Sequence, residues 1–347
     1  MTVRHALPGK IVTFYSYKGG VGRSMALANV ARLLANSLEG MSQRVLVIDW
    51  DLDAPGLHRF FSLAEIRGNG RHAGLIDYFV KLANRLDRDR RLSLRLGMLA
   101  GWKELRGRFP LGRFLVKNVA PGIDLLRAGR LDQAYREAVV EFDWAEFFER
   151  HPFAIRAFCD MVSARYPYVL VDSRTGYTDI SGICTALLPE VLVAVFSPNQ
   201  QNLDGLFPVL ERALQYRRAS DDTRPLAIFP VPSRIETADQ ERKTAWLLRF
   251  EQTFEERFKK WYRLDHCDLS RYFDRVSVPY ISDYAYGERV AVVDEPRSQK
   301  GSLREAYEIL TDRLIRLDCP WQETEAGADK NSTGSTGARE LLGREPG

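Results

Sequence analysis

A glycine-rich segment, Gly19-Gly-Val-Gly-Arg-Ser24, has the residue types best suited to chemistry in this sequence. It follows an apolar run and precedes a stretch rich in Ala and Leu, so we expect it between a strand and a helix. Backbone N–H groups and the helix dipole hold phosphate groups at such a position. Gly19, Gly20 and Gly22 can adopt backbone angles that other residues avoid, and the Ser24 hydroxyl suits a magnesium ion that bridges phosphates. The segment therefore predicts a phosphate-binding loop.

Three aspartates stand where two further apolar runs end. Asp49 and Asp51 follow one run, and Asp172 closes the other. The carboxyl ends of parallel strands meet at one edge of a sheet, where open α/β sheets bind their ligands. Carboxylates at this edge would help to hold magnesium and to aim an attacking water. They could instead be ordinary strand-end acids, but three in this order after a glycine loop favour a site.

The elements that must position these groups are short apolar strands without polar alternation, which are typical of strands buried on both faces. The order strand, loop, helix and strand at the start forms a βαβ unit and so requires parallel pairing. We expect a doubly wound α/β fold with a mainly parallel sheet and helices on both faces. The expected strands are 10–17, 44–49, 123–126, 168–172, 191–196 and 226–229, and the first helix is 25–35.

Composition excludes several classes of protein. The chain has 347 residues, 45% hydrophobic and 28% charged, enough apolar material for one large domain. It has no apolar run of about 18 residues and no signal-like start, which predicts a cytoplasmic protein. The four cysteines contain no Cys-x-x-Cys pair, so neither a disulfide framework nor a zinc site is indicated.

Several motifs carry a resemblance to a known family. Lys18-Gly-Gly-Val-Gly-Arg-Ser24 resembles the deviant Walker A motif of the ParA/MinD superfamily of P-loop ATPases, in a KGGVGR variant. Residues 45–57 resemble the superfamily's second motif, in the D-x-D-x-x-x-P form of bacterial tyrosine kinases. Residues 166–176 are similar to its Walker B strand and switch II, and 278–280 to the loop beside the nucleotide base. The resemblance implies a P-loop NTPase fold.

The resemblance also implies roles for individual residues. It places ATP against Lys18, Gly19, Gly20, Val21, Gly22, Arg23, Ser24, Met25 and Pro279, and Mg²⁺ near Ser24, Asp49, Asp51 and Asp172. Asp51 would orient or activate the attacking water, and Asp172 would bind a magnesium-coordinated water. Lys18 would reach the nucleotide of a second subunit, which implies an ATP-dependent homodimer. Lys18 and Arg23 complete the implied catalytic set.

Two departures from the family pattern concern catalysis and base recognition. Arg23 stands where the family has lysine, and its planar guanidinium is not equivalent to a compact ammonium at a phosphate site. ATP binding is expected to survive, while hydrolysis is open, and a degraded non-hydrolysing site is the alternative. Residues 229–234 contain no evident amide that could read a base, so ATP over GTP rests on the resemblance.

The motif order predicts one ATPase domain over 1–320, a mainly helical insertion over 62–150 and a disordered tail over 321–347. Residues 81–117 carry a net charge of +8 within a chain of net +4, which fits either a nucleic-acid surface or a solvated helix face. Aromatic residues recur at three- to four-residue intervals within 239–262, where we expect a core-facing helix. Residues 303–317 predict the last helix.

The sequence thus predicts a magnesium-dependent ATPase switch that forms a nucleotide-sandwich homodimer and controls a protein partner. A non-hydrolysing, nucleotide-gated scaffold with a partner surface on 62–150, or a ParA-like DNA-binding partition ATPase, remains an alternative. A tyrosine kinase is disfavoured because residues 308–347 contain no Tyr. A membrane-surface ATPase is disfavoured because 323–347 offer no apolar helix face.

Overall fold

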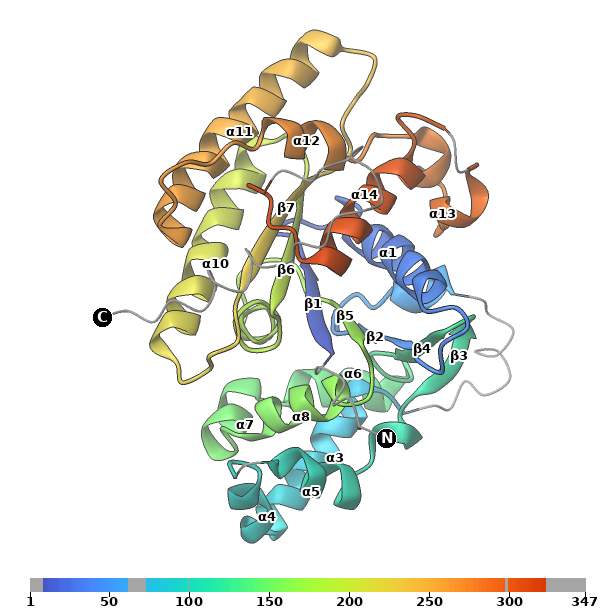
Figure 1. Cartoon of the computed structure of the whole chain (residues 1–347). Coiled ribbons are helices and arrows are strands. Elements are labelled where there is room, and N and C mark those ends of the chain that lie inside the picture. The colour runs from blue at the N-terminus through green and yellow to red at the C-terminus, as the bar shows by residue number, and fades with distance from the viewer. Residues whose placement is uncertain (1–8, 62–72, 99, 297–298, 323–347) are drawn as a thin grey trace, which may run out of the picture.

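A seven-stranded sheet forms the centre of the molecule in the computed structural model, which describes residues 9–61, 73–98, 100–296 and 299–322. The strand order is β3-β4-β2-β5-β1-β6-β7 (Figure 1), and every pair is parallel except β3 with β4. The strands are β1 (Lys10–Tyr15), β2 (Val45–Asp49), β3 (Val116–Ala120), β4 (Ile123–Leu126), β5 (Tyr168–Asp172), β6 (Val191–Phe196) and β7 (Ala227–Pro232). The predicted mainly parallel α/β sheet is confirmed.

Helices cover both faces of this sheet (Figure 1). One layer contains α1 (Arg23–Ser37), α10 (Gln200–Ala219), α11 (Gln240–Tyr262), α12 (Ser270–Val276), α13 (Ala291–Asp294) and α14 (Leu303–Arg316). The other contains α3 (Leu75–Arg88), α4 (Arg90–Arg95), α5 (Gly101–Arg108), α6 (Gln133–Glu141), α7 (Trp144–Arg150), α8 (Ala154–Ser163) and α9 (Asp179–Gly182). A π-helical turn, η3 (Ile183–Leu187), follows α9, and short 3₁₀ turns are η1 (Leu57–Phe60), η2 (Leu111–Arg113) and η4 (Ser282–Ala285).

The two helical layers bury two separate apolar cores, because successive side chains of a strand point to opposite faces. In β5, Leu170 belongs to the core under α1, whereas Val169 and Val171 belong to the core under α8. All three side chains are fully buried or nearly so. This burial on both faces explains why the strands read as continuous apolar runs and confirms the doubly wound arrangement.

The two edge strands of the sheet, β3 and β7, differ from the sequence-based expectation. β3 was not predicted, because Lys117 and Asn118 are exposed and its register against β4 is irregular. β7 extends beyond the predicted end at residue 229 through Pro230 and Pro232. Proline donates no hydrogen bond, but β7 pairs only with β6 in this sheet, and an edge strand tolerates a missing donor.

The described part of the 62–150 segment is largely helical, and it also supplies β3 and β4 to the main sheet. Its core joins the second strand through Trp50, which is fully buried. The Trp50 ring lies 5.4 Å from Phe79, 5.7 Å from Trp144 and 6.0 Å from Phe158, between ring centroids. The segment therefore packs onto the sheet directly beside the Asp49 and Asp51 strand end.

The long helix α11 faces the core as predicted, with Phe250, Phe254, Phe258 and Trp261 all buried. The predicted last helix is confirmed as α14, and residues 323–347 of the predicted tail lie outside the described residues. Within the described ranges, no helix is long and apolar enough to cross a membrane.

Candidate functional site

The glycine loop leads from β1 into α1 with an open helix N-terminus. Gly20 and Gly22 have φ angles of 75° and 88°, in the left-handed region that favours glycine. No side chain caps α1, so its first N–H groups remain available to an anion. A Cβ atom on Gly19 or Gly20 would meet nothing within 4 Å, which leaves space above the loop for a ligand.

Arg23, the first residue of α1, is buried between two carboxylates. Its Nε donates to Asp172 Oδ1 at 2.5 Å, and its Nη2 donates to Asp51 Oδ2 at 2.8 Å. Burial alone would lower the pKa of Arg23, but the charges of Asp172 and Asp51 outweigh it and raise that pKa. A guanidinium spans two carboxylates in this way because its donors form a planar fork, which a lysine ammonium lacks.

Ser24 and Asp49 complete the carboxylate cluster. Ser24 Oγ donates to Asp172 Oδ2 at 2.6 Å, so the predicted magnesium hydroxyl already contacts the predicted magnesium acid. Asp49 lies opposite Asp172 in the β2–β5 register and is fully buried. Its Oδ2 accepts the Leu57 N–H at 3.3 Å, and its Oδ1 has no partner. Burial, then the charges of Asp172 and Asp51, raise the pKa of Asp49 well above the usual range.

The predicted magnesium ligands are thus linked through Asp172: Ser24 and Arg23 donate to it, Asp49 is its register partner, and Asp51 shares the Arg23 guanidinium. Among the described residues, no group of three or more His, Cys, Asp or Glu is arranged to hold a metal ion. In this arrangement Arg23 pairs with Oδ2 of Asp51 and with Oδ1 of Asp172. Hydroxyl and carboxylate oxygens suit magnesium, so this set of residues fits the ion once Arg23 no longer pairs with the carboxylates.

Lys18, which follows β1, lies apart from this cluster and contacts the first turn of α10. It is partly buried, and its Nζ donates to Gln201 Oε1. The neighbouring Tyr17 carbonyl accepts the Gly176 N–H at 3.0 Å, and Tyr15 Oη donates to the Gly176 carbonyl at 3.0 Å. The loop entry is therefore bonded to the segment after Asp172, which corresponds to the predicted switch.

A further ion pair joins the two strand-end segments, between Arg174 and Asp53. The sequence did not predict it, although Arg174 lies in the segment that resembles switch II and Asp53 two residues after Asp51. Motif spacing alone could not predict this ion pair, because the contact depends on β2 and β5 being neighbours in the sheet.

A small pocket of about 40 Å³ lies beside the glycine loop, next to Gly22 and Met25. Pro279 lines it, so the structure brings together these three predicted residues from distant parts of the chain. Arg234 lies 5.9 Å from the Tyr280 ring centroid, and this pair shapes the outer wall. Val278 and Tyr280 come from the segment that resembles the loop beside the base, and Ser233 and Arg234 from the segment searched for a base reader. The lining residues that were not predicted are Ile281, Tyr284, Ala285, Leu303 and Tyr307.

The basic segment 81–117 is partly neutralised by its own acids. Asp89 is within 3.7 Å of Arg85 and 3.6 Å of Arg108, and Glu104 pairs with Arg95 and Arg108. These contacts favour a solvated, ion-paired helix face over a nucleic-acid surface.

Solved structures with the same fold are found over nearly the whole chain. A ParA family ATPase from Chlorobium tepidum TLS is 18% identical, with a TM-score of 0.51, over 89% of this chain and 99% of that one. MinD complexed with Mg-ADP from Pyrococcus horikoshii OT3 is 17% identical, with a TM-score of 0.51, over 89% and 97%. Cobyrinic acid a,c-diamide synthase from Mycobacterium smegmatis is 14% identical, with a TM-score of 0.52, over 89% and 94%.

No protein-family model matches the chain, and no curated protein sequence matches it either. The parallel sheet and the loop between β1 and α1 define a P-loop NTPase fold. Within that class its fold is similar to those of the ParA family ATPase and of MinD. The same fold is found in a synthase, so the reaction has to be argued from the site.

Proposed function

We propose that this chain is a magnesium-dependent ATPase that acts as a nucleotide-controlled switch. One observation carries the proposal: an uncapped helix N-terminus behind a glycine loop adjoins Arg23, which is held by Asp51 and Asp172 from two neighbouring strands. A phosphate group at the loop would contact backbone N–H donors and the Arg23 guanidinium, which is itself paired with the two carboxylates.

The residues divide the work as follows. The loop N–H groups bind the phosphates, and the small pocket beside Met25 and Pro279 provides a surface against which one edge of the base would rest. Bound magnesium would supply charge neutralisation, with the Ser24 hydroxyl and Asp172 as the residues that hold it. Asp51 orients the attacking water once Arg23 has exchanged it for a phosphate oxygen. Nucleotide binding would therefore change the hydrogen-bond partner of Asp51.

Measuring phosphate release from ATP, with magnesium and with a chelator, tests whether the protein hydrolyses ATP. We expect slow magnesium-dependent turnover in the wild type, and a loss of at least about 100-fold in Asp51→Asn with ATP binding retained. Glu288→Gln, which changes an exposed carboxylate paired with Arg59, is the matched control and should turn over at the wild-type rate. Binding of ATP without any magnesium-dependent turnover in the wild type would instead establish the non-hydrolysing scaffold.

The homodimer is part of the same proposal and concerns Lys18. Its side chain lies at the rim of the loop, where its partner is Gln201, so a second subunit could be reached without crossing the core. With ATP, sedimentation should show a dimer for the wild type and for Lys117→Ala, an exposed lysine on β3. Lys18→Ala should remain monomeric. Equal dimer content in all three proteins would contradict this role of Lys18.

A further inference from the structure

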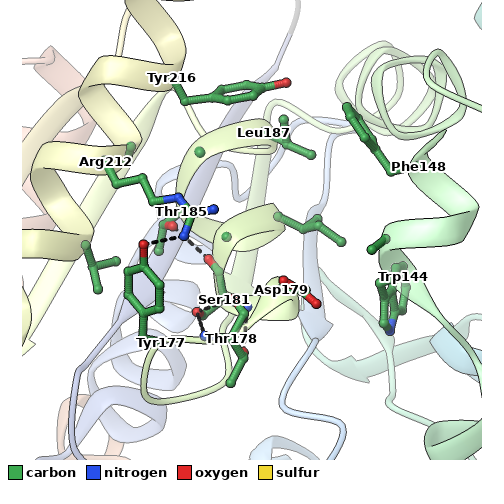
Figure 2. Close-up of a pocket in the computed structure, with 16 residues that line it drawn as sticks. Trp144, Phe148, Tyr177, Thr178, Asp179, Ser181, Thr185, Leu187, Arg212 and Tyr216 are labelled. Atoms are coloured by element: carbon green, nitrogen blue, oxygen red, sulfur yellow. Dashed lines mark hydrogen bonds between the residues drawn. The ribbon is translucent and has the colours of Figure 1, made fainter.

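A groove distinct from the glycine loop opens between α7, α10 and the segment 177–187 (Figure 2). Its volume is about 180 Å³, and most of its lining is apolar. The principal walls are Trp144 and Phe148 from α7, Ile183 and Leu187 from η3, and Val209 and Tyr216 from α10. None of these side chains takes part in the proposed nucleotide chemistry.

The size of this groove suits a single side chain better than a whole small molecule. Pockets that enclose drug-sized ligands have volumes of about 300–1,000 Å³. Protein interfaces, in contrast, often concentrate their affinity in one apolar anchor that fills a small pocket. Tyr177 and Tyr216 border the groove and are 56% and 39% exposed, so the apolar surface continues beyond the pocket itself.

The charges around the groove indicate what should accompany the anchor. Arg212 is exposed on the α10 wall, donates to the Tyr177 hydroxyl and lies 5.0 Å from the Tyr177 ring centroid. Among the described residues, the contacts of Arg212 are with Tyr177 and no salt bridge to a carboxylate is found, while Asp179 lies toward the Trp144 side of the groove (Figure 2). A partner carboxylate is therefore favoured on the α10 side and disfavoured beside Asp179.

The groove walls also contact residues of the nucleotide site. Trp144 packs on Trp50, the residue between Asp49 and Asp51. Tyr177 directly follows Gly176, which is bonded to the glycine-loop entry. The floor includes the π-helical turn η3, and π-helical turns occur frequently at functional sites. An occupant of this groove would touch segments connected to both strand ends.

We propose that this groove docks a segment of a partner protein that presents one large apolar side chain with a carboxylate beside it. The apolar side chain enters between Trp144 and Val209, and the carboxylate pairs with Arg212. This inference goes beyond the proposed function, because docking of the segment requires no hydrolysis of ATP.

The test uses the full chain and an array of short synthetic peptides in a Gly/Ser background. Each peptide carries a central Leu, Phe or Ser, flanked by Asp, Lys or Ser, and binding is measured by fluorescence anisotropy. We expect peptides with Leu or Phe beside Asp to bind at least about tenfold more tightly than those with a central Ser. Replacing Asp by Lys should also weaken binding.

Two groove variants and their controls sharpen this test. A Cβ atom on Gly182 would meet nothing within 4 Å, and Gly182 lines the groove with helical backbone angles, so Gly182→Leu fills it without a backbone clash. It should weaken peptide binding at least about tenfold, whereas Gly107→Leu, equally uncrowded on α5, should change it less than about twofold. Arg212→Glu should reverse the preference from Asp to Lys, and Arg212→Lys should retain it.

Three outcomes would overturn the proposal: no peptide bound above the all-Ser sequence, tight peptides that are insensitive to Gly182→Leu, or an acidic preference that persists in Arg212→Glu. An apolar dye that is displaced by Gly182→Leu, in the absence of peptide binding, would reassign the groove to a small molecule. Circular dichroism of each variant confirms that it is folded.

Discussion

At the scale of single residues, the unusual feature of this site is a buried arginine that holds two carboxylates at once. Arg23 is 7% exposed, and its Nη1 has no partner, while Nε and Nη2 bind Asp172 and Asp51. Buried charges are tolerated only when they are paired, so this guanidinium and these acids depend on one another. The third nitrogen is left for a further acceptor, and a phosphate oxygen would provide one.

We predict that Arg23→Ala lowers the free energy of unfolding by about 3 kcal/mol at neutral pH, because it leaves two buried carboxylates without their partner. Urea denaturation monitored by circular dichroism measures the change. The control is Arg59→Ala, which removes a pair with Glu288 whose side chains are 63% and 43% exposed. It should change the free energy of unfolding by less than about 1 kcal/mol. Equal losses in both variants would mean that the buried pairs do not form in solution.

At the scale of elements, α10 connects the glycine loop to the proposed docking groove. Gln201 at its start contacts Lys18, Gly205 lies against the Tyr17 ring, and Arg212 borders the groove. A Cβ atom on Gly205 would lie 2.1 Å from the Tyr17 ring, which is closer than any real contact. Glycine inside a helix costs stability, and here the close approach of the loop entry accounts for it.

We predict that Gly205→Ala destabilises the protein by about 1–3 kcal/mol, because overpacking outweighs the better helix propensity of alanine. It should also weaken ATP binding, since the displaced Tyr17 precedes Lys18. Gly107→Ala on α5 adds a Cβ atom in open space and should stabilise the protein by up to about 1 kcal/mol.

A double variant makes this prediction sharper. In Tyr17→Ala/Gly205→Ala the clash is removed, so the two changes should cost less together than the sum of their separate costs. Thermal and urea unfolding of the four proteins complete the cycle. Strictly additive effects would show that α10 and the loop entry are not in contact.

At the scale of the whole molecule, one sheet separates two apolar cores. The segment 62–150 supplies β3 and β4 to the sheet and surrounds Trp50, so removal of its packing would expose the strand that carries Asp49. This continuity supports the proposal of one domain with an insertion, rather than two independent domains.

Tryptophan fluorescence can test this proposal, because the six tryptophans divide between the two layers. Trp50, Trp102 and Trp144 belong to one, and Trp246, Trp261 and Trp321 to the other. The experiment uses two variants, each with the tryptophans of one layer replaced by Phe. In each variant we predict that fluorescence and far-ultraviolet circular dichroism report the same urea midpoint. A fluorescence midpoint separated from the dichroism midpoint in the variant that retains Trp50, Trp102 and Trp144 would show that the layer containing 62–150 unfolds independently.

Much of the architecture could be predicted from local sequence alone. The buried strands β4, β5 and β6 were predicted at their observed bounds, because continuous apolar runs ending in turn residues have few other interpretations. The glycine loop and the positions of Asp49, Asp51 and Asp172 followed from the same order of strands. Sequence therefore determined which residues come to the carboxyl edge of the sheet.

Only the tertiary structure decided which of those residues touch. The pairing of Arg23 with both Asp51 and Asp172 depends on β2 and β5 being neighbours in the sheet. In that pairing Asp49 and Asp172 are register partners, although their strands lie far apart in the sequence. The groove likewise requires α7, η3 and α10 to meet, which no local pattern encodes. Periodicity in a sequence reports whether a side chain is buried, whereas its contact partners are set by strand order and by packing between distant segments.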